Sequence, residues 1–141
     1  MMDFVDFKTL KRPRSPNTHL LAPKDLCEAS KPDRLSKTLP IAPDALFASL
    51  LSMVEDRKDW ELGEYDEDRR LIHFVAVSRL FRYKDDIDIL VLPAEAGDPD
   101  DHAGARLAIY SRSRIGHSDL GANKKRVSEL LKSLRNVRVD T

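Results

Sequence analysis

Apolar residues recur at the spacing of an α-helix in two segments of the chain. The first begins at Pro43 and ends near Arg57, and its apolar stripe consists of Leu46, Phe47, Leu50, Leu51 and Val54. The second covers residues 122–135, with a stripe of Val127, Leu130, Leu131 and Leu134. Proline is accepted in the first turn of a helix, because the N–H that it lacks would have no partner there. The pattern therefore predicts two amphipathic helices, each with one face for a core.

Between these helices, four segments have the alternating or continuous apolar pattern of β-strands: 60–65, 71–81, 87–92 and 105–111. Short acidic segments such as 66–69 and 97–102 separate strands, which favours antiparallel hairpins. The first forty residues contain five prolines and no sustained period, so they should be mostly irregular, although 19–22 could add an edge strand. We expect an α+β fold with an antiparallel sheet of four strands, or of five if 19–22 joins it, and with two helices packed on one face.

The length and composition of the chain suit one folded domain. Its 141 residues are 41% hydrophobic and 34% charged, which is enough for one core. We expect a flexible N-terminal arm at 1–12, a single α+β domain at 13–136 and a C-terminal tail at 137–141. No apolar run reaches the length of a membrane span, and the first eleven residues lack the apolar core of a signal peptide. The chain as written is expected in the cytoplasm, or in the periplasm or at a membrane if a leader has been removed.

Charge is balanced over the whole chain but unevenly distributed. Lys and Arg number 24, as do Asp and Glu. Residues 1–40 have a net charge of +3, residues 41–103 of −9 and residues 104–141 of +6. The basic C-terminal third could therefore bind an anion although the total is zero. We do not expect a nucleic-acid partner, because no known reader motif or aromatic stacking platform accompanies the basic helix.

The alternation of the central strands assigns their charged residues to one side of the sheet. If Ile87, Ile89 and Val91 face the core, Asp86 and Asp88 lie on the opposite face. The partner strand would place four more residues on that face: Arg106, Tyr110, Arg112 and Arg114. Ser111 and Ser113 would instead continue the apolar face towards the helices. The charged face is either a salt-bridged surface, with pairs worth ~0.2–1 kcal/mol each, or a concave site where Arg112 or Arg114 can still bind a carboxylate or phosphate.

The segment 110–126, YSRSRIGHSDLGANKKR, runs from a strand through a glycine-containing turn into the basic helix. Backbone N–H groups at such a helix start can attract an anion or fix the fold. On the binding hypothesis, the ligand residues are Arg112, Arg114, Ser118, Asn123 and Arg126. On the architectural hypothesis, Ser118 or Asp119 caps the helix and Gly116 and Gly121 allow positive φ or close backbone contact. Asn123 would then bond a neighbouring loop such as 15–17, and Arg126 would pair with Asp119 or Asp86.

Three segments together resemble a known family: PRSPN at 13–17, the strand with Asp86 and Asp88, and SRSRIGHSDLGANKKR at 111–126. They are similar to the bacterial and plant domain of unknown function family 1499, over about residues 13–134. The resemblance implies a domain without an established activity. The motif residues carried over by position are Pro16, Asn17, Asp86, Ser111, Arg112, Ser113, Arg114, Gly116, Ser118, Asp119, Gly121, Asn123 and Arg126. Thr18 stands where the family often has a cysteine, which argues against a thiol mechanism.

No catalytic or metal-binding pattern emerges from the sequence. His117, Ser118 and Asp119 are consecutive and cannot by themselves form a triad, and the four histidines lack metal-ligand spacing. Cys27 is the only cysteine, which excludes an internal disulfide, a paired-thiol redox site and a cysteine-rich zinc site. We expect no metal and no cofactor. The leading hypothesis is a non-enzymatic module that binds an anionic small molecule or a protein partner. The alternatives are an enzyme acting on an anionic metabolite at the same polar corner, with Asp86, Asp88 or Asp119 as acid or base, and a lipid-binding cavity between helix and sheet.

Overall fold

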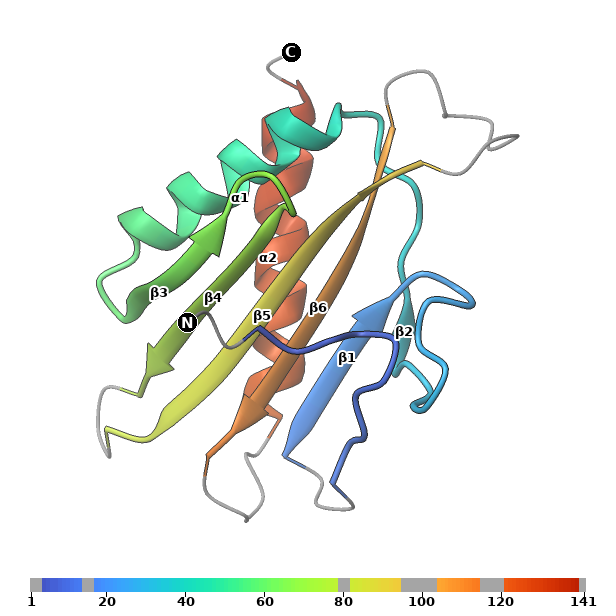
Figure 1. Ribbon diagram of the computed structural model, residues 1–141. Helices are drawn as coiled ribbons and strands as arrows, with labels where there is room; N and C mark the ends of the chain where they lie inside the picture. Colours follow the sequence, from blue (N-terminus) through green and yellow to red (C-terminus); the bar gives the residue numbers. More distant parts are fainter. Residues whose placement is uncertain (1–3, 14–16, 79–81, 95–103, 115–120, 140–141) are drawn as a thin grey trace.

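The computed structural model describes residues 4–13, 17–78, 82–94, 104–114 and 121–139, which form an α+β fold (Figure 1). Along the chain, its elements are β1 (Thr18–Ala22), β2 (Arg34–Leu35), α1 (Pro43–Asp56), β3 (Trp60–Asp66), β4 (Leu71–Val77), β5 (Lys84–Pro93), β6 (Ala105–Ser113) and α2 (Ala122–Val139). Both predicted helices are present, and α2 continues beyond the predicted end at residue 135. No helix in the described part of the chain is long and apolar enough to cross a bilayer.

The strands form one mixed sheet in the order β2-β1-β6-β5-β4-β3. Strands β3 to β6 are the predicted antiparallel meander. The sheet nevertheless has six strands, so the prediction of four or five antiparallel strands was incomplete. β1 pairs antiparallel with β6 on one side and parallel with β2 on the other, so it is not an edge strand.

The short strand β2 depends on contacts that a sequence pattern does not reveal. It has two exposed residues, too few to show an alternation. Asp33, immediately before it, holds it beside β1: its N–H donates to the carbonyl oxygen of Leu20 at 2.9 Å, and its Oδ2 accepts from the Leu20 N–H at 2.9 Å. A non-local pair of hydrogen bonds therefore adds this strand.

Both helices pack on one face of the sheet, as predicted (Figure 1). The core between them takes alternate residues from the strands, among them Ile72, Phe74, Ile87, Ile89, Leu107 and Ile109, which are at most 1% exposed. The helices contribute Leu46, Phe47, Leu50, Val54, Val127, Leu130 and Leu134. Leu51 and Leu131, at the margins of the predicted stripes, are only half-buried.

The opposite face of the sheet is covered in part by the N-terminal segment, which crosses it (Figure 1). Phe7 is 2% exposed and packs in a second apolar cluster with Leu20 and Tyr110. The described residues of the segment predicted to be a flexible arm, 1–12, therefore contact the sheet. The division into arm, domain and tail remains a prediction.

Candidate functional site

The described residues of the predicted motif divide between the two faces of the sheet. Successive side chains of a strand point to opposite faces, so Ser111 and Ser113 of β6 face the helices while Arg112 faces away. In β5, Asp86 pairs with Arg112 and Asp88 with Tyr110. The predicted register of the central strands is confirmed.

On the face away from the helices, five residues form a charged group that we call the His73 cluster: His73, Asp86, Asp88, Arg112 and Arg114. His73 Nδ1 lies 2.9 Å from Asp88 Oδ1, and His73 Nε2 lies 3.4 Å from Asp86 Oδ1. Arg112 donates to Asp88 Oδ1 at 2.9 Å, and Arg114 makes two bonds to Asp86, at 2.9 and 3.0 Å. Opposite charges thus alternate across three neighbouring strands, β4, β5 and β6.

The cluster holds its side chains in their charged forms. Hydrogen bonds with Asp86 and Asp88 raise the pKa of His73 from 6.5 to about 9, against the effect of burial. Burial acts to raise the pKa of Asp86, but bonds from His73 and Arg114 outweigh it and hold that pKa well below its ordinary range. The pKa of Asp88 is likewise lowered: burial opposes this, and the bond with His73 and the charge of Arg112 prevail. Near neutral pH, His73 is therefore an imidazolium between two carboxylates.

The arginines of this cluster already have protein acceptors. Asp88 is fully buried and also accepts the Val5 N–H at 2.9 Å, so it ties Arg112 to the N-terminal segment. The Arg112 guanidinium also lies over the Tyr110 ring, 4.9 Å from its centroid. Arg114 is half-exposed but makes a bidentate pair with Asp86. The arrangement therefore fits the hypothesis of a salt-bridged surface better than the hypothesis of a concave ligand site.

On the other face, a second group lies under α2 and is called the Asn123 cluster: Asp85, Ser111, Ser113, Asn123 and Arg126. Ser111 Oγ donates to Asn123 Oδ1 at 2.6 Å, and Asn123 Nδ2 donates to Ser113 Oγ at 3.1 Å. Arg126 donates to Ser111 Oγ and Asn123 Oδ1, both at 3.0 Å, and forms an ion pair with Asp85 at 3.0 Å. Asn123 and Ser111 are fully buried, so this network fixes the start of α2 on the sheet.

Two details of the architectural hypothesis can be compared with this geometry. Asn123 Nδ2 donates to the Asn17 carbonyl oxygen at 2.8 Å, so the predicted bond to the 15–17 loop is confirmed. The predicted pair between Arg126 and Asp86 is wrong, because Asp86 points to the other face of β5 and its neighbour Asp85 takes its place. Gly121, just before α2, has a φ of 81°, the left-handed conformation that glycine adopts easily.

The predicted ligand residues are not brought together in one corner. Arg112 and Arg114 belong to the His73 cluster, whereas Asn123 and Arg126 lie on the helix-covered side. The remaining motif residues, Pro16, Gly116, Ser118 and Asp119, lie outside the described residues, as does His117. Within the described part, no group of three or more histidine, cysteine or carboxylate side chains has an arrangement that could hold a metal ion.

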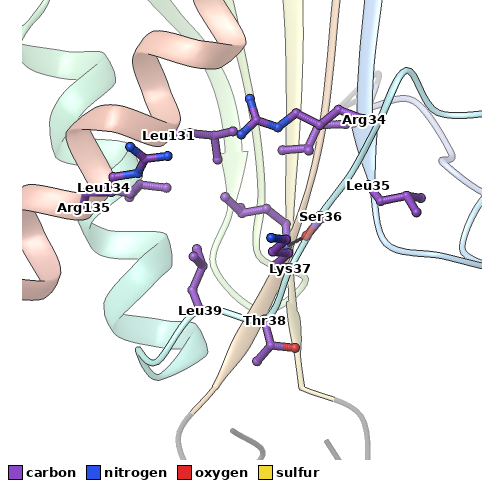
Figure 2. Close-up of a pocket in the computed structure, with 11 residues that line it drawn as sticks. Arg34, Leu35, Ser36, Lys37, Thr38, Leu39, Leu131, Leu134 and Arg135 are labelled. Carbon is purple, nitrogen blue, oxygen red and sulfur yellow. Dashed lines mark hydrogen bonds between the residues drawn. The ribbon is translucent and has the colours of Figure 1, made fainter. Parts of the chain in front are cut away.

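A pocket that the sequence did not indicate lies between β2, the segment after it and α2, and we call it the basic groove (Figure 2). Its volume is about 270 Å³. Its cations are Arg34, Lys37 and Arg135, and its leucines are Leu21, Leu35, Leu39, Leu107, Leu131 and Leu134. Ser36 and Thr38 complete the lining. Figure 2 shows Arg34 reaching from β2 towards Leu131 of α2, while Leu35 points away from the helix.

Among the described residues, the three cations of the basic groove lack the carboxylate partner that most of the arginines have. Arginines with a carboxylate partner are Arg12, Arg57, Arg70, Arg112, Arg114 and Arg126. Arg34, Lys37 and Arg135 make no ion pair with any residue that the structure describes. The uneven charge of the chain was the available signal, because the groove joins its two positively charged regions, 1–40 and 104–141. The two regions come together only because β2 joins the sheet, and β2 has no alternation of apolar residues that would predict it.

Comparison with known proteins agrees with the resemblance drawn from the motif. A family model described as "Protein of unknown function (DUF1499)" matches residues 10–134. No curated protein matches the chain in a sequence comparison. The family model spans most of the chain, including every described element from β1 to β6 and the first part of α2. The chain therefore belongs to the DUF1499 family of proteins of unknown function.

Proposed function

We propose that this domain is a non-enzymatic binding module for a small anionic molecule, and that the basic groove is its binding site. The observation that carries the proposal is the convergence of Arg34, Lys37 and Arg135 on one pocket, without a carboxylate among the residues that line it. Like charges gathered around a concavity raise the local concentration of a counter-ion and bind it more strongly than scattered surface charges do.

The arginines of the two clusters are weaker candidates for the same role. An anion at Arg112 or Arg126 would have to compete with Asp88 or Asp85, each already within 3.0 Å. Displacing a buried carboxylate from its partner leaves an uncompensated charge, which costs about 3–5 kcal/mol. Binding at the basic groove has no such cost. The ligand role predicted for Arg112, Arg114, Ser118, Asn123 and Arg126 stays a hypothesis to be tested alongside.

The chemistry of the groove favours binding over catalysis. The residues that line it include hydroxyl groups but no carboxyl, imidazole or thiol group that could act as a base or nucleophile. One of the two hydroxyl groups, Ser36 Oγ, accepts the Leu107 N–H at 3.2 Å, which fixes the segment against β6. A bound anion would be held by the charges of the groove, beside hydroxyl groups that have no imidazole or carboxylate base in the lining to activate them.

The test is thermal unfolding at low salt in the presence of inorganic phosphate, short carboxylates and phosphorylated metabolites. A ligand present at a hundredfold excess over its Kd stabilises the folded state by about 3 kcal/mol, and high salt should weaken this effect. We expect the stabilisation to be lost in Arg34→Gln and Arg135→Gln and kept in Lys132→Gln, which removes an exposed charge of α2 outside the groove.

Two results would contradict the proposal. One is that no anion stabilises the wild-type protein. The other is that Arg34→Gln and Arg135→Gln respond to the anion as the wild type does, while a folded Arg112→Ala variant no longer responds. The second result would return the site to the residues predicted from the sequence.

A further inference from the structure

The wall of the basic groove is more apolar than the binding of a hydrophilic anion requires. Leu39 and Leu131 are half-buried and leave apolar surface in the groove. Behind them lie Leu21, Leu107 and Leu134, which belong to the core and are each at most 2% exposed. These leucines come from β1, β6, α2 and the segment after β2, so the apolar wall is continuous across the sheet and the helix. Apolar surface that stays in contact with water is a source of affinity for any ligand that covers it.

The cations approach this wall from both sides. Arg34 and Lys37 lie on β2 and in the segment that follows it, and Arg135 lies on α2 (Figure 2). An anionic head group can therefore be held by guanidinium and ammonium groups while a hydrocarbon chain attached to it lies along the leucines. Arginine and lysine both suit such a site, since each has donors for a carboxylate or phosphate and an apolar stem.

On the basis of the proposed function, we infer that the anion bound in the basic groove is a single-chain amphiphile, with a carboxylate or phosphate head and an alkyl tail. The volume of the groove suits a single alkyl chain, because about 270 Å³ is near the lower end of the range of ligand-pocket volumes and is small for a lipid with two chains.

The test is a titration with n-alkyl carboxylates of increasing length, from acetate to decanoate, each kept below its micelle concentration. Each methylene that becomes buried should increase the affinity by about two- to fourfold, until the chain is longer than the groove. An n-alkyl phosphate of matched length distinguishes the two head groups. A neutral alkyl alcohol of the same length should bind much more weakly, because it lacks the charge.

Two variants separate the head group from the tail. Arg34→Gln should lower the affinity for every member of the series by a similar factor, whereas Leu131→Ala should reduce the gain per methylene. The matched control for the second variant is Leu51→Ala, a half-buried leucine of α1 outside the groove. Far-UV circular dichroism verifies that each variant is folded.

The outcomes distinguish this inference from the proposed function. If acetate and phosphate bind but a longer alkyl chain does not increase the affinity, the inference of an amphiphile is refuted and the proposed anion site stands. If no member of the series binds, and no small anion does, both are refuted. If the protein associates with vesicles of anionic phospholipid but with no monomeric alkyl anion, the inference is overturned in favour of a membrane surface.

Discussion

The stability of the folded protein should fall as the pH rises from 6 to 9, through the titration of His73. Its ring lies between two carboxylates, 2.9 Å from Asp88 and 3.4 Å from Asp86. These contacts raise its pKa from 6.5 to about 9. A group whose pKa is higher in the folded state binds its proton more tightly there, so protonation stabilises the fold. The stabilisation is complete below pH 6.5 and is lost as the pH rises through 9.

The size of the effect follows from the difference between the two pKa values of His73. Each pKa unit corresponds to about 1.4 kcal/mol, so the unfolding free energy should fall by about 2–3 kcal/mol across this range. The carboxylates contribute nothing to this slope, because the lowered pKa values of Asp86 and Asp88 affect stability only at acid pH. Burial lowers the pKa of His19, so this group makes the fold more stable as the pH rises through 6.5, and burial raises the pKa of the Cys27 thiol, which lowers stability at the alkaline end of the range. Both groups are also present in a variant at His73, so comparison with that variant removes their contribution.

Urea unfolding at several pH values from 6 to 9 measures this dependence. Trp60, the only tryptophan, is 7% exposed and lies 4.8 Å from the Phe74 ring, so its fluorescence should report the unfolding of the core. His73→Gln is the matched variant, because glutamine can donate one hydrogen bond but does not titrate. We expect the wild type to lose about 2–3 kcal/mol more stability across the range than the variant does. Equal slopes for the two proteins would refute the assignment to His73.

Two further predictions concern the clusters. Arg112→Ala should lower the unfolding free energy by about 2–4 kcal/mol, because it removes a partner of the fully buried Asp88, whereas Arg114→Ala at a half-exposed pair should cost less than about 1 kcal/mol. Equal losses in urea unfolding would contradict this contrast. Asn123→Ala should cost about 2–4 kcal/mol, because it leaves several buried donors and acceptors at the start of α2 without partners. A loss below about 1 kcal/mol would show that water replaces the side chain.

The elements whose pattern is local could be predicted from the sequence alone. Each helix shows its buried stripe within its own residues, and the central strands show their alternation in the same way. The alternation also placed Asp86 and Asp88 on one face of the sheet, and Ser111 and Ser113 on the other. A period of two assigns every residue of a strand to a side once one residue is assigned, which is why this prediction was confirmed.

Which charged side chains already have a partner in the protein could be seen only in the folded structure. Arg112 and Arg126 looked like ligand residues in the sequence, but the fold gives them the carboxylates of Asp88 and Asp85. Arg34 and Arg135 lie far apart along the chain, and only the pairing of β2 with β1 and the packing of α2 bring them to one groove. The capacity of a charged group to bind a ligand depends on what the fold places next to it, and that neighbour comes from distant parts of the chain.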